Sequence, residues 1–369
     1  MGLILLLYEL LMVLIFIFLI ALSLRKERDS YRESKGYRPS VLVIVPCKGL
    51  DIGLLRNLKS LKGQGYANFK LLPVVDSHKD EAVPEIRKAG LAYMVSSPKF
   101  DKGSGKVNAI STAISANPGY DIYVIADSDI CTNKHWLELL IRPLADPSVG
   151  ISTAYPYFRP IGGFWSTVKS VWGFVGEGLM ESGLTRFGWG GSLAFRGGIL
   201  KGRRFATFQE CVSDDVPITN MAKAMGYRIA YVKAAQPVVD TADGLPAFWE
   251  WANRQTAFST LGFSRIFAYG VVFYASQILL LVSSLALSAA VSGWFLVLLL
   301  PFLLGAHRAY LRARERKLAS LLIYPFMNFI YLANLVVAAN TKEVRWRGRS
   351  YGLGRLSELK AGLRPAGKG

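Results

Sequence analysis

Two aspartates separated by one serine follow an apolar stretch of the sequence. Residues 121–130 read DIYVIADSDI, so β-branched and aromatic residues precede Asp127 and Asp129. In an extended segment the two carboxylates point to the same side, where they repel each other unless a cation lies between them. Mg²⁺ and Mn²⁺ prefer oxygen ligands and are often held by one or two carboxylates together with substrate phosphates. We predict that Asp127 and Asp129 bind a divalent cation carrying a nucleotide diphosphate, although a solvated acidic turn has the same pattern.

Two further acidic positions could take part in this chemistry. Asp76 ends the apolar run 69–76, where its carboxylate could accept hydrogen bonds from a base or a ribose, although aspartates are also common in turns after strands. Asp214 and Asp215 precede an apolar helical run with Pro217 in its first turn. Acids at that place can cap a helix and complement its dipole. One of two adjacent acids can do this while the other acts as a catalytic base, so both roles stay open.

Cationic side chains and a glycine-rich stretch accompany these acids. Lys48 follows the first apolar strand and Lys106 opens a helical segment, so each could contact phosphate oxygen or lie on the surface as an ordinary lysine. Residues 188–198 read GWGGSLAFRGG, a glycine loop around Ser192 that suits close approach of the backbone. Arg254 lies in the aromatic segment 248–255, whose tryptophans an interfacial aromatic belt would also explain.

Alternating strands and helices must position these residues. Apolar runs that favour strands alternate with runs whose apolar residues recur at helical spacing, an order typical of an open α/β sheet. In such sheets ligands bind beyond the carboxyl ends of the strands. We predict a Rossmann-like α/β domain over 38–260, with strands at 40–46, 69–76 and within 121–130, and helices at 53–64, from 82 and at 105–117. Segment 156–180 is aromatic and weakly charged, and it is either an interfacial or a buried helix.

Apolar segments at both ends of the chain predict a membrane protein. Of the 369 residues 51% are hydrophobic, and 266–306 and 318–341 carry no charge. A crossing helix needs about 20 such residues, so we predict an anchor over 1–24 and about three membrane segments over 266–341. The first segment has a longer apolar core than a signal peptide and no basic residues before it, which favours an uncleaved anchor. Segment 318–341 either spans or is re-entrant; we favour a tail that returns to the cytoplasmic side, with Trp346–Tyr351 near the active site.

The net charge of +18 comes largely from basic residues beside the apolar segments. They cluster at 25–38, at 308–317 and in the tail 342–369. The positive-inside rule then places the domain in the cytoplasm, and the charge predicts attraction to an anionic membrane surface rather than to nucleic acid. The three cysteines and three histidines form no metal-ligand spacing, and the cysteines suit a reducing compartment. We therefore predict an integral, multi-pass protein.

The order of these motifs resembles that of the inverting GT-A family 2 glycosyltransferases, and more closely that of the ceramide glucosyltransferases. The resemblance covers almost the whole chain, including one apolar segment before the domain and several after it. It is carried by Pro46-Cys47-Lys48-Gly49-Leu50-Asp51, Lys106-Val107-Asn108, Asp214-Asp215 and Trp346-Arg347-Gly348-Arg349-Ser350-Tyr351.

The resemblance implies a role for each matching residue. Asp76 would contact the nucleotide base, Asp127 the ribose or diphosphate, and Asp129 the metal, while Asp215 would be the catalytic base. Pro46, Lys48 and Lys106 would belong to the nucleotide-sugar site. The acceptor and diphosphate region would include Gly191, Ser192, Asp214, Arg254, Trp346, Arg347 and Arg349. The implied reaction is transfer of a sugar, glucose in the family, from a UDP-linked donor to the hydroxyl of a membrane lipid such as ceramide.

One departure and several alternatives accompany this interpretation. The family's Gln/Arg-x-x-Arg-Trp segment reads Trp251-Ala252-Asn253-Arg254-Gln255 here, which leaves the role of Arg254 open and argues against a processive polysaccharide synthase. A polyprenyl-phosphate sugar synthase or a polysaccharide synthase is the alternative of the same class. A membrane scaffold with an inactive sugar site is the alternative of another class, and a transporter is disfavoured because the apolar segments carry almost no ionisable residues.

Overall fold

The computed structural model describes residues 2–24, 36–262 and 264–353, which fall into two compact units. The sheet unit comprises Arg28–Phe158, Gly176–Thr241 and Thr341–Gly369. The helical unit comprises Met1–Glu27, Arg159–Val175 and Ala242–Asn340. The basic residues 25–35 and 354–369, for which the sequence predicts a place beside the membrane, lie outside the described residues.

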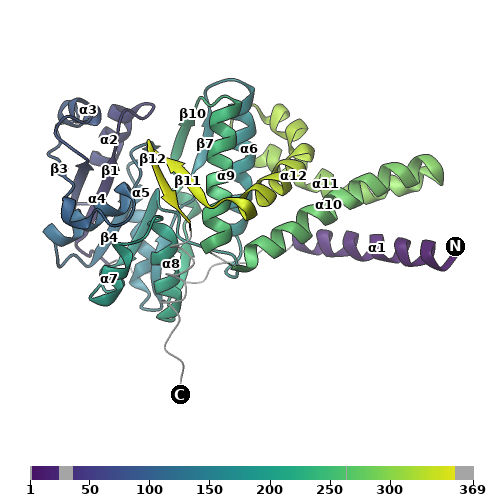
Figure 1. Ribbon diagram of the computed structural model, residues 1–369, viewed down its shortest axis with the longest axis horizontal. Helices are drawn as coiled ribbons and strands as arrows, with labels where there is room; N and C mark the ends of the chain where they lie inside the picture. Colours follow the sequence, from purple (N-terminus) through teal and green to yellow (C-terminus); the bar gives the residue numbers. More distant parts are fainter. Residues whose placement is uncertain (1, 25–35, 263, 354–369) are drawn as a thin grey trace, which may run out of the picture. The chain divides into compact units, whose positions relative to one another are not determined.

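A seven-stranded mixed sheet forms the centre of the sheet unit, with the strand order β3-β2-β1-β4-β8-β6-β9 (Figure 1). The first four of these pair in parallel, β8 runs antiparallel to both of its neighbours, and β6 and β9 are again parallel. A three-stranded sheet has the order β5-β10-β7. The strands are β1 (Val41–Cys47), β2 (Phe69–Val75), β3 (Met94–Val95), β4 (Ile122–Ala126), β5 (Ile130–Cys131), β6 (Val149–Thr153), β7 (Tyr157–Pro160), β8 (Ser192–Arg196), β9 (Arg228–Tyr231) and β10 (Val238–Thr241).

Burial explains why β1 lies inside the sheet. Residues 41–45 are at most 1% exposed, as expected for an apolar strand that pairs in parallel on both sides. Cys47 of β1 lies opposite Val75 of β2, and Ile44 of β1 lies opposite Ile125 of β4. The carboxyl ends of these three strands therefore meet at one edge of the sheet, as the sequence predicts.

Helices connect the strands, and a hairpin near the end of the described chain completes the sheet unit. α4 has Ser104 as its N-cap, because the Ser104 hydroxyl accepts a hydrogen bond from Val107 N at 3.2 Å. The helices are α2 (Leu54–Lys62), α3 (Ala82–Lys88), η1 (Pro98–Phe100), α4 (Gly105–Ala116), α5 (Trp136–Ile141), η2 (Arg142–Ala145), α7 (Arg203–Phe208), α8 (Asp215–Ala224) and η3 (Lys233–Ala235). The hairpin consists of β11 (Glu343–Trp346) and β12 (Arg349–Gly352).

The helical unit contains the apolar segments. Its elements are α1 (Gly2–Leu24), most of α6 (Phe164–Met180), α9 (Leu245–Gly262), α10 (Ser264–Ala290), η4 (Gly293–Leu299), α11 (Leu300–Arg312) and α12 (Lys317–Asn340). α1 and α10 lie side by side in Figure 1, where Met12 and Leu19 of α1 share a buried cluster with Leu280 of α10 and Leu298 of η4. The N-terminal apolar helix α1 is thus packed against a later apolar segment.

Three helical segments in the described chain are long and apolar enough to cross a membrane. They are Phe267–Ala290, Gly293–Arg312 and Lys317–Asn340, and Leu6–Leu22 is a shorter apolar stretch of α1. Large apolar side chains on these helices are exposed, including Ile4, Val272 and Phe326. Apolar surface of this extent suits contact with lipid better than contact with water.

The structure decides between the two predictions for 156–180. β7 occupies the beginning of this segment, and α6 follows. Trp172 Nε1 donates a hydrogen bond to Asn334 Oδ1 at 3.0 Å, and the Tyr331 hydroxyl donates one to Trp172 O at 3.0 Å. Within the helical unit α6 is therefore a buried helix, which packs against α12.

Candidate active site

Acidic and basic side chains meet at the edge formed by the ends of β1, β2 and β4. Lys48 follows β1 and Asp76 follows β2, and Lys48 Nζ lies 2.8 Å from Asp76 Oδ2. Pro46 is a residue of β1 near the same end. Because the strands are parallel neighbours, residues that are 28 positions apart in the chain form this ion pair. The structure thus brings together the side chains that the sequence assigns to nucleotide recognition.

The turn between β4 and β5 carries Asp127, Ser128 and Asp129. Ser128 is buried, and its hydroxyl donates a hydrogen bond to Asp51 Oδ2 at 2.5 Å while its carbonyl accepts one from Asn57 Nδ2 at 3.1 Å. Asp127 N donates to Gly191 O at 3.1 Å. The middle residue therefore fixes the turn to the protein interior. Asp127, Ser128 and Asp129 follow β4 in a turn rather than in the extended segment that the sequence suggested, and Asp127 and Asp129 are both partly buried.

Lys106 connects this turn to the acidic pair. Its Nζ lies 2.7 Å from Asp127 Oδ1 and 3.0 Å from Asp214 Oδ2, and it donates a hydrogen bond to Gly190 O at 3.4 Å. Burial alone lowers the pKa of Lys106, but the charges of Asp127 and Asp214 outweigh it and raise this pKa above its usual value. The first turn of α4 thus holds a permanent positive charge between the two acidic groups.

Asp214 and Asp215 differ in their surroundings although they are adjacent. Desolvation raises the pKa of the buried Asp214 to about 6; Lys106 opposes this shift and Asp215 adds to it. Asp215 is half-buried, and its Oδ1 accepts hydrogen bonds from the Ser213 hydroxyl at 2.5 Å and from Val216 N at 2.8 Å. Its Oδ2 accepts one from Gly190 N at 3.2 Å. An ionised carboxylate has about four lone-pair sites, so Asp215 keeps capacity to accept a proton from a substrate.

The glycine loop before β8 allows this arrangement. A Cβ atom added at Gly190 would lie 2.4 Å from Asp214 Oδ2, so only glycine leaves room for that carboxylate. The expected close approach of the backbone is therefore present at Gly190. Ser192 is instead the first residue of β8, where it is fully buried and its Oγ accepts a hydrogen bond from Trp136 Nε1 at 2.9 Å.

The β11–β12 hairpin brings cationic side chains to the same edge. Arg347 forms an ion pair with Asp51, while Arg349 lies 3.3 Å from Asp101 and 3.8 Å from Asp76. Tyr351 Oη accepts a hydrogen bond from Gly105 N at 3.3 Å. Burial lowers the pKa of Arg347, but Asp51, and beyond it Asp129 and Asp127, raise it. Trp346 pairs with Arg349 across the hairpin, and the segment Trp346–Tyr351 therefore lies at the candidate active site.

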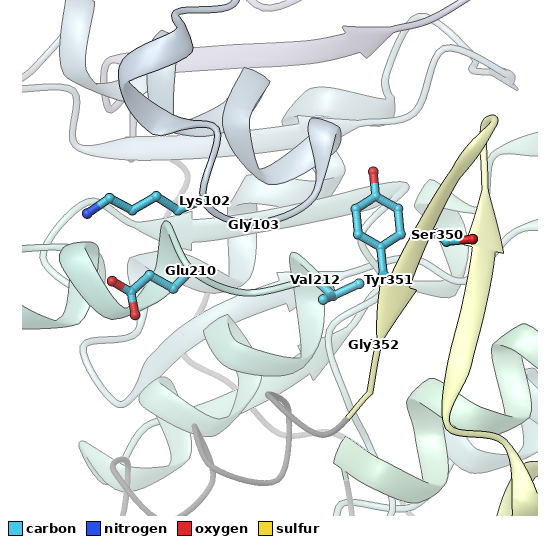
Figure 2. Close-up of a pocket in the computed structure, with 7 residues that line it drawn as sticks. All are labelled: Lys102, Gly103, Glu210, Val212, Ser350, Tyr351 and Gly352. Atoms are coloured by element: carbon cyan, nitrogen blue, oxygen red, sulfur yellow. The ribbon is translucent and has the colours of Figure 1, made fainter.

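A pocket of about 350 Å³ lies beside the hairpin (Figure 2). It is lined by Lys102 and Gly103 from the loop before α4, by Glu210 and Val212 from the segment before α8, and by 350–352 of β12. In Figure 2 the Tyr351 ring extends from β12 towards the segment that contains Gly103. The pocket thus adjoins the segments that carry Lys106 and Asp214.

The structure adds to the sequence-based prediction at two kinds of residue: a predicted site residue in the helical unit, and residues at the site to which the sequence assigned no role. Arg254 belongs to α9 of the helical unit, where Nη1 lies 4.0 Å from Glu250 Oε1. The sequence analysis assigned no role to Asn57, Asp101 or Asp51, although Asp51 is the last residue of the motif that begins at Pro46. The sequence could have indicated Asn57, because it is a polar residue on the apolar face of α2; its side chain is fully buried there.

The donor set at the turn suits a hard divalent cation. No group of three His, Cys, Asp or Glu side chains that could hold a metal ion occurs in the part of the chain that the structure describes. Asp127 and Asp129 would supply carboxylate oxygens, and the charges of both raise the pKa of the nearby Arg347. Substrate phosphates and water would complete the coordination, as is usual for Mg²⁺ sites. The residues therefore fit such an ion.

Solved structures of glycosyltransferases resemble this chain, including the following two. A mannosyltransferase from Pyrobaculum calidifontis, solved with GDP-Man and Mn²⁺, aligns over 89% of this chain and 93% of its own, with a TM-score of 0.51 and 18% identity. Glucosyl-3-phosphoglycerate synthase from Mycobacterium tuberculosis, solved with Mn²⁺ and UDP-glucose, aligns over 64% and 84%, with a TM-score of 0.41 and 14% identity. The first likeness shows the GT-A fold, and the second is too weak to support an argument.

Family membership follows from the sequence as a whole. Residues 8–358 match the model of glycosyl transferase family 21, which is nearly the full chain. The match includes both the sheet unit with its acidic edge and the apolar helices. The chain therefore belongs to glycosyl transferase family 21 and is a glycosyltransferase of the GT-A fold.

Proposed function

We propose that this protein transfers one sugar, glucose, from a UDP-linked donor to the hydroxyl of a ceramide-like membrane lipid, with inversion at the anomeric carbon. The position of Lys106 is the observation that carries the proposal. Its ammonium lies within 3.0 Å of both Asp127 and Asp214. Lys106 also donates a hydrogen bond to Gly190 O, and Gly190 N donates one to Asp215, the candidate catalytic base. The candidate donor-binding turn and this base are therefore close together, as a direct displacement requires.

Residues at the strand ends bind the donor. The Asp76 carboxylate, oriented by Lys48, contacts the nucleotide, and the turn of Asp127 and Asp129 holds Mg²⁺ or Mn²⁺. The bound cation supplies charge stabilisation for the diphosphate leaving group. Lys106 and Arg347 add positive charge near the turn. Fixed charges of this kind lower the barrier because they need no reorganisation during the reaction.

Asp215 accepts the proton of the acceptor hydroxyl. The lipid oxygen forms its bond to the anomeric carbon while the bond from that carbon to the diphosphate oxygen breaks, and the hydroxyl proton passes to the carboxylate. Asp215 is half-buried and Asp214 is buried, so Asp215 is the more accessible of the two to a substrate. Hydrogen bonds from Ser213 and Gly190 orient its carboxylate.

The apolar helices bring the acceptor to the enzyme. The exposed apolar surfaces of α1, α10 and α12 suit a bilayer, so a lipid can present its headgroup without leaving the membrane. The basic segment 308–317 lies on the cytoplasmic side under the positive-inside rule. The sheet unit then faces the cytoplasm, where nucleotide sugars are available to it.

We infer that α12 does not cross the membrane, and the course of the chain supports this inference. If Phe267–Ala290 and Gly293–Arg312 both cross, the chain returns to the side from which it entered. After α12 ends at Asn340, the chain forms the hairpin that pairs with Asp51 in the sheet unit. Under this inference α12 begins and ends on the same side of the membrane. Its internal Pro325 and its buried Asn328 suit a re-entrant or surface position.

Product analysis tests this proposal. The full chain in lipid nanodiscs is incubated with Mn²⁺, labelled UDP-glucose and ceramide, with UDP-galactose and GDP-mannose as competing donors. We expect one glucose on the lipid, with the opposite anomeric configuration to the donor, by mass spectrometry and nuclear magnetic resonance. A long polymer or a polyprenyl-phosphate sugar would reassign the acceptor. Absence of transfer from every donor would refute the proposed reaction.

A further inference from the structure

The carboxylate of Asp51 has two partners from distant parts of the chain. Its Oδ2 accepts the hydrogen bond from the Ser128 hydroxyl at 2.5 Å, and its Oδ1 pairs with the guanidinium of Arg347. The Asp51 side chain is only 10% exposed, whereas the side chain of Arg347 is 45% exposed, so the Ser128 contact is the more shielded of the two. One carboxylate thus joins the middle residue of the metal-binding turn to the β11–β12 hairpin.

The Ser128 end of this connection controls the turn. Asn57 Nδ2 holds the carbonyl of Ser128 at 3.1 Å, and Asp51 holds its hydroxyl. Rotation of Ser128 would carry Asp127 and Asp129 with it, because they are its chain neighbours. Groups that orient metal ligands in this way commonly change metal affinity by 10- to 100-fold when removed.

The Arg347 end controls the seating of the hairpin. Arg347 and Gly348 form the two-residue turn of the hairpin, with φ of 49° and 76°, which is the backbone of a type I′ turn. Arg349 and Tyr351 on the following strand contact Asp101 and Gly105. Arg347 therefore extends from the tip of the hairpin to Asp51, while β12 contacts the loop before α4.

We propose that Asp51 is a positioning residue that couples the β11–β12 hairpin to the metal-binding turn, so that seating of the hairpin and cation binding at Asp127 and Asp129 favour each other. This inference rests on the proposed metal site. Coupling between two sites is reciprocal. Binding of Mn²⁺ with UDP must then stabilise the hairpin, and the part of the effect that exceeds direct attraction between Arg347 and the diphosphate must pass through the Ser128 hydroxyl.

Hydrogen exchange of the hairpin amides in the full chain measures this coupling. In the wild type we expect Mn²⁺ with UDP to slow exchange over 343–352 by about fivefold or more. Ser128→Ala removes the hydroxyl without changing any charge, and Mn²⁺ with UDP should then slow exchange by a clearly smaller factor than in the wild type, also at saturation. Ser128→Ala should also weaken Mn²⁺ binding about tenfold in electron paramagnetic resonance titrations.

A matched control and a second variant complete the test. Ser111→Ala is the control, because Ser111 is also a buried serine and its hydroxyl has no hydrogen-bond partner among the residues that the structure describes; it should behave like the wild type. Asp51→Asn should accelerate hairpin exchange even without ligand, since Arg347 loses its ionic partner. If Mn²⁺ with UDP protected the hairpin amides as much in Ser128→Ala as in the wild type, or if their exchange were unchanged in Asp51→Asn, the coupling would be refuted while the proposed metal site would stand. A wild type that binds no Mn²⁺ with UDP or GDP would refute the metal site and the coupling with it.

Discussion

Gly190 offers the sharpest single perturbation of the site. An alanine Cβ at this position would lie 2.4 Å from Asp214 Oδ2, 3.0 Å from its Cγ and 3.1 Å from its Oδ1. Comfortable contacts between such atoms begin at about 3.5 Å, so the Asp214 carboxylate or the glycine loop must move by roughly 1 Å. Either movement disturbs the 3.0 Å contact of Asp214 with Lys106 and the 3.2 Å hydrogen bond from Gly190 N to Asp215.

The expected effect on catalysis is large. Misplacement of a catalytic group by about 1 Å can lower a rate by about 100-fold, which corresponds to about 2.7 kcal/mol in the barrier. The extra methyl group also overpacks a buried position, at a cost of about 1–3 kcal/mol in the free energy of unfolding. We therefore expect Gly190→Ala to fold, with a lower melting temperature, and to lose about 100-fold in kcat.

Gly198→Ala is the matched control for this prediction. Gly198 lies in the same glycine-rich segment, is exposed and has no heavy atom within 4 Å of an added Cβ. Both variants are assayed for sugar transfer at saturating donor, and thermal unfolding is followed in parallel. Gly198→Ala should match the wild type. A Gly190→Ala variant with kcat within about twofold of the wild type would show that Asp214, Lys106 and Asp215 do not depend on the close contact described here.

Three further predictions concern the acidic residues. Asp215→Asn should bind UDP like the wild type, measured by calorimetry, but lose transfer by at least about 100-fold; loss of UDP binding instead would make Asp215 a structural cap. Asp129→Asn should lose transfer and weaken Mn²⁺ binding at least about tenfold. Chelation of the metal should likewise abolish transfer by the wild type. Transfer that is unchanged by both the substitution and chelation would remove the metal from the mechanism. Because the pKa of Asp214 is raised to about 6, the residue binds a proton as the pH falls through about 6, and Lys106 then loses one partner. We expect transfer to decline below that pH, and an unchanged acid limb in the pH profile of Asp214→Asn would contradict this.

The first half of the sheet could be predicted from the sequence because its strands are buried apolar runs. β1, β2 and β4 begin and end within one residue of the predicted segments, apart from the acidic turn after β4. Their parallel order then brought Lys48, Asp76 and Asp127 to one edge by a general rule. The helical spacing of 105–117 likewise predicted α4 and placed Lys106 in its first turn.

The later strands and the contacts of the hairpin could not be predicted in the same way. β8 lies inside the glycine-rich segment, where glycines suggest a loop, and it is fixed by antiparallel pairing to both β4 and β6. Arg347 pairs with a residue 296 positions away in the chain, and no local pattern encodes such a contact. Asp51 was visible in a motif, but its role depends on the side chain of Ser128, whose direction only the fold determines.

The position of a bound cation tests the central claim most directly. A crystal or cryo-EM structure of the full chain with Mn²⁺ and UDP would locate the ion, by anomalous scattering in the crystal. We predict Mn²⁺ within about 2.5 Å of a carboxylate oxygen of Asp127 or Asp129 and in contact with the diphosphate. Bound UDP whose diphosphate lies away from both carboxylates, with no Mn²⁺ between them, would contradict the account.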